Sequence, residues 1–246
     1  MTLKTSKLVL VGKTGAGKST IANMLIQGDL FQKNRLDISN QAKGVTTNVE
    51  VVDGRDWTVV DTVGLGEMQG IGAKGTDEAI DLLIRVLKEG QLGFHHIAFV
   101  VQKGRLSTTE NKQLFDLFKA TFAGAEKNFV LIVTQCYDPR WIFEPKNRSV
   151  IAEVFGPEIS VVCCDFPEDG RRPEQDREDR LTSLQLLEGQ FLSLNRQPIV
   201  PKLSKPETAT EETKTEFADK LGSFLGVSMT VILKIARIAL KVFLGI

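Results

Sequence analysis

The segment LVLVGKTGAGKST, residues 8–20, constrains the fold of this chain more than any other stretch. Four apolar residues lead into a glycine-rich loop that fits the phosphate-binding pattern G-x-x-x-x-G-K-[ST]. Glycine lets the backbone approach phosphate oxygens and point N–H groups at them, and the following helix adds the positive end of its dipole. We therefore expect a nucleotide to bind at Gly12, Lys13, Thr14, Gly15, Ala16, Gly17, Lys18, Ser19 and Thr20.

Two residues of this loop have specific expected roles. The ammonium group of Lys18 would reach the β- and γ-phosphates, and the hydroxyl group of Ser19 would ligate Mg²⁺. The context supports this interpretation, because an apolar strand precedes the loop and residues 19–27 carry apolar side chains at helical spacing. A plain glycine-rich turn between a strand and a helix is the alternative.

Strand and helix patterns alternate along the rest of the first 195 residues. Apolar or β-rich runs predict strands at 48–53, 56–61, 96–102, 128–134 and 159–164. Helical periodicity occurs at 77–89, 108–122, 145–155 and 179–194. Ser107 with Glu110 is a capping box that would open the second of these helices. The alternation predicts an α/β fold with a mostly parallel sheet, helices on both faces and ligands at the carboxyl ends of the strands.

A second motif lies in WTVVDTVGLG, residues 57–66. Its strand ends at Asp61, and Gly64 follows three positions later, which gives the pattern D-x-x-G. We expect Asp61 to hold the metal through water and the N–H group of Gly64 to contact a γ-phosphate. At this offset from a phosphate loop, the pattern favours a GTPase over a generic ATPase. The glycine-rich stretch from 64 to 75 would order around the third phosphate, and a long surface loop is the alternative.

Thr46 and Thr47 precede the second predicted strand, in the segment GVTTNVEVV. A threonine at this place completes the Mg²⁺ shell in the first switch of GTPases. Both residues qualify, and the sequence does not choose between them. Ordinary β-propensity also explains two threonines that enter a strand.

The stretches GKTGAGKST, VVDTVGLGE and FHHIAFVVQKGRLSTTE together resemble the AIG-type G domain. This family contains the GTPases of immunity-associated proteins and is related to the chloroplast import-receptor GTPases. The resemblance covers about residues 5–195 and implies a P-loop NTPase G domain that binds GTP or GDP with Mg²⁺. It also implies a homodimer across the nucleotide face, in which an arginine acts in trans. The matching residue is Arg105, with Lys103 as a weaker candidate and a solvated loop as the alternative.

Three departures from the family pattern bear on activity. Leu65 follows Gly64, where Ras-type GTPases place a water-orienting glutamine, so we expect slow intrinsic hydrolysis. The base-reading motif reads TQCYD: Thr134 ends the strand, but Gln135 replaces the usual lysine and the aspartate comes one position late. Guanine specificity should therefore be weaker. Asp165, in the last loop, is the expected substitute contact, with an ordinary strand-end aspartate as the alternative.

Composition limits the partners and the compartment. Lys+Arg and Asp+Glu both number 31, so no bulk positive field suggests nucleic acid. The three cysteines lack metal-ligand spacing, which suits a reducing, cytoplasmic location. No signal peptide is visible.

The C-terminal region predicts a different kind of segment. Residues 196–216 are polar and dotted with proline, which indicates a linker between a G domain at 1–195 and a C-terminal amphipathic helix at 217–246. That helix carries one polar stripe in an otherwise apolar surface, made of Ser223, Thr230, Lys234, Arg237 and Lys241. We expect residues 221–246 to bind a membrane surface, either in the interface or as a tail anchor. Packing against the G domain is the alternative.

Taken together, the motifs predict a guanine-nucleotide switch, peripheral or tail-anchored on the cytosolic face of a membrane. Two other functions stay open. A nucleotide-binding scaffold that does not hydrolyse would suit the missing glutamine and the altered base-reading motif. A P-loop phosphotransferase would use the arginine-rich stretch 171–180 as a lid, although the acidic residues within it favour a solvated loop.

Overall fold

The structure is a computed structural model that describes residues 6–28, 49–54, 56–62, 73–194, 197–205 and 207–225, with the backbone alone for 73–81. Its sheet has the strand order β2-β3-β1-β4-β5-β6. Only β2 is antiparallel to its neighbour, so the expectation of a mostly parallel sheet is confirmed. The strands are β1 (Ser6–Gly12), β2 (Val49–Asp53), β3 (Trp57–Thr62), β4 (His96–Gln102), β5 (Phe129–Thr134) and β6 (Ser160–Cys163).

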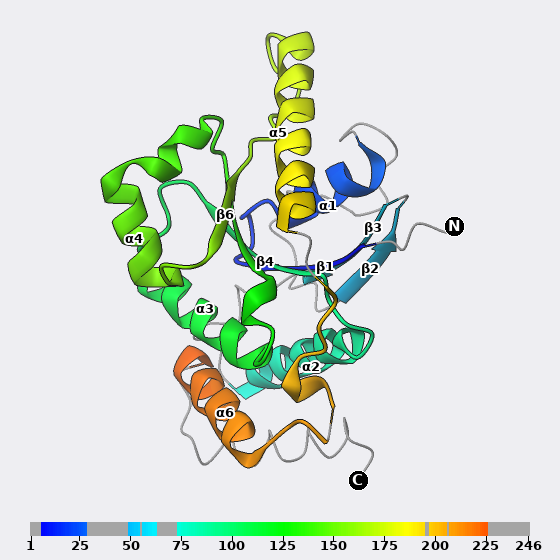
Figure 1. The fold of residues 1–246 in the computed structure, drawn as a ribbon, viewed down its shortest axis with the longest axis vertical. Helices are drawn as coiled ribbons and strands as arrows, with labels where there is room; N and C mark the ends of the chain where they lie inside the picture. The colour runs from blue at the N-terminus through cyan, green and yellow to red at the C-terminus, as the bar shows by residue number, and fades with distance from the viewer. Residues whose placement is uncertain are drawn as a thin grey trace.

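Helices cover both faces of this sheet (Figure 1). They are α1 (Lys18–Gln27), α2 (Ala73–Gly90), α3 (Thr109–Thr121), α4 (Pro145–Phe155), α5 (Pro173–Leu194) and α6 (Glu211–Leu225), with short 3-10 turns η2 (Glu126–Asn128), η3 (Pro139–Phe143) and η4 (Lys202–Ser204). Alternate residues of β1 serve the two faces. Leu8 and Leu10 pack with α1 and α5, whereas Val9 and Val11 pack with α2, α3, α4 and α6.

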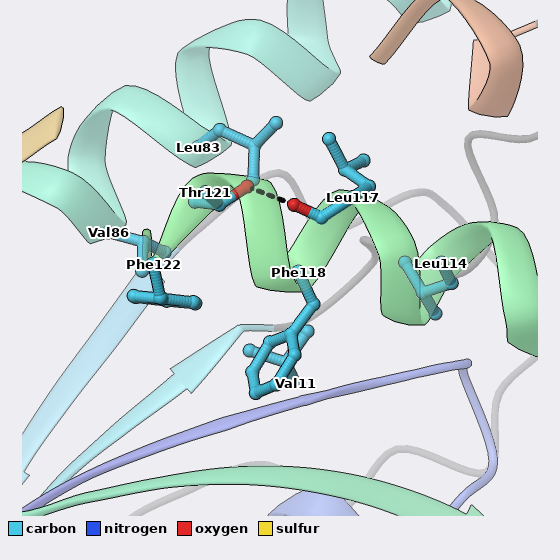
Figure 2. Close-up of a pocket in the computed structure, with 8 residues that line it drawn as sticks. All are labelled: Val11, Leu83, Val86, Leu114, Leu117, Phe118, Thr121 and Phe122. Carbon is cyan, nitrogen blue, oxygen red and sulfur yellow. Dashed lines mark hydrogen bonds between the residues drawn. The ribbon is translucent and has the colours of Figure 1, made fainter. Parts of the chain in front are cut away.

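The core under α2 and α3 is closely packed. Figure 2 shows side chains from α2, α3 and β1 that surround a small apolar cavity, with the Thr121 hydroxyl donating to the Leu117 carbonyl at 2.7 Å. The volume of this cavity is about 10 Å³, which is at most enough for one water molecule. It is therefore a packing gap and not a place for a ligand.

Two helix starts differ from the sequence prediction. The N-cap of α3 is Thr108 and not Ser107: the Thr108 backbone is extended, and its hydroxyl accepts from the Asn111 N–H at 3.1 Å. Helix α5 begins at Pro173, six residues before the predicted 179, because proline is favourable at the first helical position. Most of the arginine-rich stretch is therefore helix. Arg180 is buried and pairs with Asp169 at 2.8 Å, so it is not part of a lid.

The described part of the expected linker packs against the domain. Ile199 exchanges two backbone hydrogen bonds of 2.9 Å with Phe94, just before β4. Leu203 is fully buried, and the N–H of Lys202 donates to the Ala123 carbonyl at 2.7 Å. Residues 197–205 of the expected linker thus contact the domain, because Leu203 is buried and Ile199 is partly buried despite the prolines and charges around them. The division of the chain at residue 195 stays a prediction.

Helix α6 begins at Glu211, before the predicted 217, and packs beside α3 (Figure 1). Its apolar side chains join the core on that face of the sheet: Phe217, Ala218, Leu221, Phe224 and Leu225. The cationic stripe that begins at Lys234 lies outside the described residues, so the amphipathic tail stays a prediction. Within the part of the chain that the structure describes, no helix combines the length and the apolarity that a membrane crossing requires.

Candidate nucleotide-binding site

The phosphate loop, residues 12–17, lies where the carboxyl ends of β1, β3, β4 and β5 meet. Close contacts with the neighbouring strands explain two of its glycines. A Cβ on Gly12, where φ is 156°, would lie 2.3 Å from the Val100 carbonyl oxygen of β4. A Cβ on Gly17, where φ is 95°, would lie 3.2 Å from a methyl group of Thr134 in β5. The loop is thus held directly against two strands, and only glycine permits this conformation.

Lys18 opens α1 and is 6 % exposed. Its ammonium group donates to the carbonyl oxygens of Gly12, at 2.9 Å, and Lys13, at 3.0 Å. The positive charge therefore lies inside the curve of the loop. An ammonium group in this place is a point charge with three donors, which suits phosphate oxygens.

Ser19 and Asp61 meet beside this lysine. The Ser19 hydroxyl donates to Oδ2 of Asp61 at 2.7 Å, although the residues come from α1 and β3. Asp61 is 1 % exposed, and its Oδ1 has no hydrogen-bond partner among the described residues. Burial raises the pKa of Asp61, while the charge of Lys18 and the Ser19 bond act in the opposite direction. A hydroxyl group and a buried carboxylate with an unpaired oxygen are the oxygen donors that Mg²⁺ prefers, so these residues fit the expected metal.

Thr134, at the end of β5, contacts the phosphate loop. Its hydroxyl lies 2.8 Å from the Ala16 carbonyl oxygen and 3.4 Å from that of Val101, and the shorter distance marks the stronger bond. The structure therefore brings Thr134 into contact with the loop, as a residue that positions the two parts of one site.

The backbone after Thr134 contains one extra residue. The Cys164 N–H donates to the Val133 carbonyl and the Cys164 carbonyl accepts from the Cys136 N–H, so two residues separate the partners where a regular parallel ladder has one. Gln135 is left-handed there, with φ at 53°. Its side-chain carbonyl accepts a hydrogen bond from the Gln102 amide of the neighbouring strand. The bulge thus fixes the direction of the Gln135 side chain.

Asp138, the late aspartate of the motif, is used within its own turn. Its carboxylate accepts from the backbone N–H and from Nε of Arg140, both at 2.9 Å. These bonds to the Arg140 side chain, and then to its backbone, hold the pKa of Asp138 below its ordinary value. The carboxylate that would read guanine in the usual motif is thus engaged with a neighbouring arginine.

Asp165 and Lys103 lie next to this region. Asp165 follows Cys164 directly, its N–H donates to the Ser183 hydroxyl at 2.9 Å, and burial raises its pKa. The Lys103 N–H donates to the Thr134 carbonyl at 2.9 Å, and its ammonium group lies 5.5 Å from the ring centre of Trp141. Sequence reasoning considered Lys103 only as a trans residue. The pairing of Gln102 with Thr134 places Lys103 beside the turn that follows Thr134, and its expected role in trans stays a prediction.

Arg105 follows β4 in the loop that leads to α3, and its side chain is exposed. The loop is held from inside: the Arg105 carbonyl accepts from the side-chain amide of Asn111, which is 3 % exposed. Lys13 of the phosphate loop lies 3.8 Å from the carboxylate of Glu110, at the start of α3. Arg105 therefore belongs to a segment that borders the phosphate loop and presents its guanidinium group to solvent.

Four residues that the sequence assigns to the nucleotide and its metal lie outside the described residues: Thr46, Thr47, Gly64 and Leu65. The expected metal contact of the threonines and the γ-phosphate contact of Gly64 therefore stay predictions.

Comparison with known proteins supplies a family. The sequence model of the AIG1 family matches residues 6–138. Immune-associated nucleotide-binding protein 7 of Arabidopsis thaliana is 29 % identical over 126 residues, which cover 51 % of this chain and 39 % of that protein. Immune-associated nucleotide-binding protein 10 of the same plant is 35 % identical over 109 residues, which cover 42 % and 22 %. The chain thus spans about two fifths and one fifth of these relatives.

Among solved structures, a dimerization-deficient mutant of Toc33 from Arabidopsis thaliana superimposes with a TM-score of 0.54 at 16 % identity. The match covers 78 % of this chain and 86 % of the Toc33 chain. At this identity the likeness shows a shared fold, and it agrees with the α/β arrangement described above.

Proposed function

Because this chain belongs to the AIG1 family, we propose that it is a switch protein that binds GTP or GDP together with Mg²⁺. The observation that carries the proposal is the contact of Ser19 with buried Asp61 beside Lys18. This is the donor set that a nucleotide-bound magnesium ion needs, and it lies at the mouth of a loop shaped by glycines.

Each residue of the site has a separate role in binding the nucleotide. Lys18 exchanges the carbonyl oxygens of Gly12 and Lys13 for phosphate oxygens, at little cost because its charge already lies in the loop. Ser19 and Asp61 would hold the metal, Asp61 through water, and Thr46 or Thr47 would complete the set. Mg²⁺, when bound, neutralises charge on the β- and γ-phosphates. Thr134 fixes the loop relative to the base-reading strand.

Hydrolysis of GTP is slow in this proposal. Leu65 has no polar group with which to orient a water molecule, in contrast to the glutamine of Ras-type enzymes. When two copies meet across their nucleotide faces, the exposed guanidinium group of Arg105 supplies a positive charge that stabilises the transition state in the partner copy. Such an arginine contributes about 10³–10⁵ in rate in other GTPases.

Recognition of the base is less strict than in a typical GTPase. Asp138 is engaged with Arg140, and Gln135 stands where a lysine is usual. The other polar side chains near the turn at 135–138 are those of Gln102, Lys103 and Asp165. A site with fewer dedicated partners for guanine leaves fewer buried groups unpaired when adenine enters.

Because most of residues 221–225 is buried in α6, it is the part of the C-terminal segment after α6, residues 226–246, that places the protein on the cytosolic face of a membrane. Support comes from the cationic stripe of Lys234, Arg237 and Lys241 within an apolar sequence. Cations in the interface meet anionic headgroups, whereas the bilayer centre would cost several kcal/mol. The described helix α6 then serves as the base from which this segment extends.

The proposed function is tested by Lys18→Ala, with Lys127→Ala as the control. Lys127 is exposed and follows α3 on the edge opposite to the phosphate loop. Fluorescent GTP and GDP are titrated into each folded protein with and without Mg²⁺. We expect Lys18→Ala to abolish binding and Lys127→Ala to leave it unchanged. Undiminished affinity in folded Lys18→Ala protein contradicts the assignment of the phosphate loop.

The same preparations also test the alternative function, a nucleotide-binding scaffold that does not hydrolyse GTP. A protein that binds GTP with Mg²⁺ but produces no phosphate at any protein concentration is the non-hydrolysing scaffold. The engagement of Asp138 by Arg140 is the observation that favours this second function.

A further inference from the structure

Two cysteine sulfurs lie in close contact behind the base-reading turn. The Sγ atoms of Cys136 and Cys163 are 2.8 Å apart. A disulfide bond is about 2.05 Å long, so the sulfurs are roughly 0.8 Å from bonding distance. The two residues are 1 % and 2 % exposed, and both are free thiols. Their side chains already contact one another, one from the turn after β5 and the other from the end of β6.

The bulge at Gln135 creates this contact. Along β5, Val133 faces the cluster under α3 and α4, so regular alternation would turn position 136 to the opposite face, where Cys164 lies. The extra residue reverses the alternation, and Cys136 joins Cys163 on the face of Val133. A left-handed glutamine costs conformational energy, which makes this placement a specified feature of the turn.

The chemical surroundings of the two thiols are unequal. The hydrogen bond between the two thiols lowers the pKa of Cys136 and raises the pKa of Cys163. The positive charge of Lys103 acts to lower the pKa of both thiols. Burial raises the pKa of Cys164, which lies on the other face of the sheet. Cys136 precedes the exposed Tyr137 in the turn, so an opening of this turn uncovers it first and makes it the attacking thiol, with Cys163 as its partner and Cys164 as an internal control.

We propose that Cys136 and Cys163 are a reversible oxidation site that takes a low-molecular-weight disulfide as its substrate and links the turn after β5 to the end of β6. The turn holds Gln135, and the loop that follows β6 contains Asp165. The effect on nucleotide affinity rests on the proposed function. A covalent link that draws Cys136 toward β6 moves the neighbouring Gln135 away from Gln102, and so weakens nucleotide binding.

The reaction is two thiol–disulfide exchanges. The Cys136 thiolate attacks one sulfur of oxidised glutathione, the glutathione S–S bond breaks, and the leaving thiolate takes up a proton. Sγ of Cys163 then attacks Sγ of Cys136, the mixed disulfide bond breaks, and the leaving glutathione thiolate takes up the proton that the Cys163 thiol loses. Two protein thiols are oxidised and one glutathione disulfide is reduced to two thiols. Because both sulfurs are buried, exchange proceeds through opening of the turn at 135–138, whose Tyr137 is 63 % exposed.

The test equilibrates the full chain with mixtures of reduced and oxidised glutathione. Thiols are then blocked by alkylation in denaturant, and the bridged peptides are mapped by mass spectrometry. We expect a loss of two hydrogen atoms, a link between Cys136 and Cys163, and a single alkylated thiol at Cys164. Cys164→Ser should leave the link intact, and Cys136→Ser or Cys163→Ser should remove it. Three free thiols in every mixture, or a link through Cys164, would overturn the proposal.

Nucleotide titration gives the second readout. Oxidised protein should bind fluorescent GDP at least about fivefold more weakly than reduced protein, the lower end of common coupling between sites. Dithiothreitol should restore the affinity, and Cys164→Ser should behave like the unchanged chain. Equal affinity of linked and reduced protein overturns the coupling. If neither form binds a guanine nucleotide, the proposed function fails, while the peptide map still decides whether the thiols pair.

Discussion

Helix α6 provides a sharp test of how the C-terminal part of the described chain is organised. Leu221 of α6 is fully buried, whereas Leu192 of α5 is 74 % exposed. Leu→Ala at the two positions therefore removes the same atoms from opposite environments. Truncation of a buried leucine costs about 2–5 kcal/mol in unfolding free energy, because transfer free energy is lost and a cavity remains. Truncation of an exposed leucine changes it by no more than about 0.5 kcal/mol.

The assay is urea unfolding of the full chain, followed by circular dichroism. A domain has about 5–15 kcal/mol of stability, so both variants should still fold. With a urea dependence of about 3 kcal/mol per molar, a loss of 3 kcal/mol moves the midpoint of Leu221→Ala down by about 1 M. The Leu192→Ala midpoint should stay near that of the unchanged chain. If the two variants unfold alike, α6 does not belong to the core, and the separate tail expected from the sequence is right.

Three further predictions concern charge. The pKa of Asp61 is raised above 3.8 in the folded protein, so ionisation of this carboxyl group opposes folding. The free energy of unfolding, relative to that of Asp61→Asn, should therefore be highest at low pH and fall as pH rises through the folded pKa. Urea unfolding at a series of pH values measures this. GTP hydrolysis per molecule should rise with protein concentration, and Arg105→Ala should flatten that rise without lowering affinity; a rate independent of concentration in both proteins argues against action in trans. Flotation with anionic vesicles should weaken with salt and fall when Lys234, Arg237 and Lys241 are replaced by glutamate; flotation that survives both changes indicates a spanning anchor.

The sequence was informative wherever a local pattern decides the structure. The phosphate loop could be predicted because its glycines and Lys18 form a contiguous motif. The strands could be predicted because runs of buried β-branched and apolar residues are typical of a parallel sheet. Ser19 follows the loop after β1, and Asp61 lies near the end of β3. These parallel strands end at the same edge of the sheet, so the two side chains meet there.

The sequence was less informative where distant contacts decide. The burial of Leu203 and the packing of Ile199 depend on partners near β4 and after α3, and the prolines and charges around them do not reveal these contacts in the local sequence. The bulge at Gln135 depends on pairing with β6, so neither the contact of Cys136 with Cys163 nor the turn of Asp138 toward Arg140 follows from the motif. The early start of α5 could have been found, since Pro173 with acidic residues in the next turn is a helix-start signal.

The most direct test of the central claim is the nucleotide that the protein carries when it is purified. The full chain is isolated in Mg²⁺, denatured, and the released compounds are separated and identified by chromatography and mass spectrometry. The account predicts GDP or GTP in the unchanged chain and in Lys127→Ala, and neither in folded Lys18→Ala protein. A protein that releases no guanine nucleotide and that binds none when GTP is added with Mg²⁺ would contradict it.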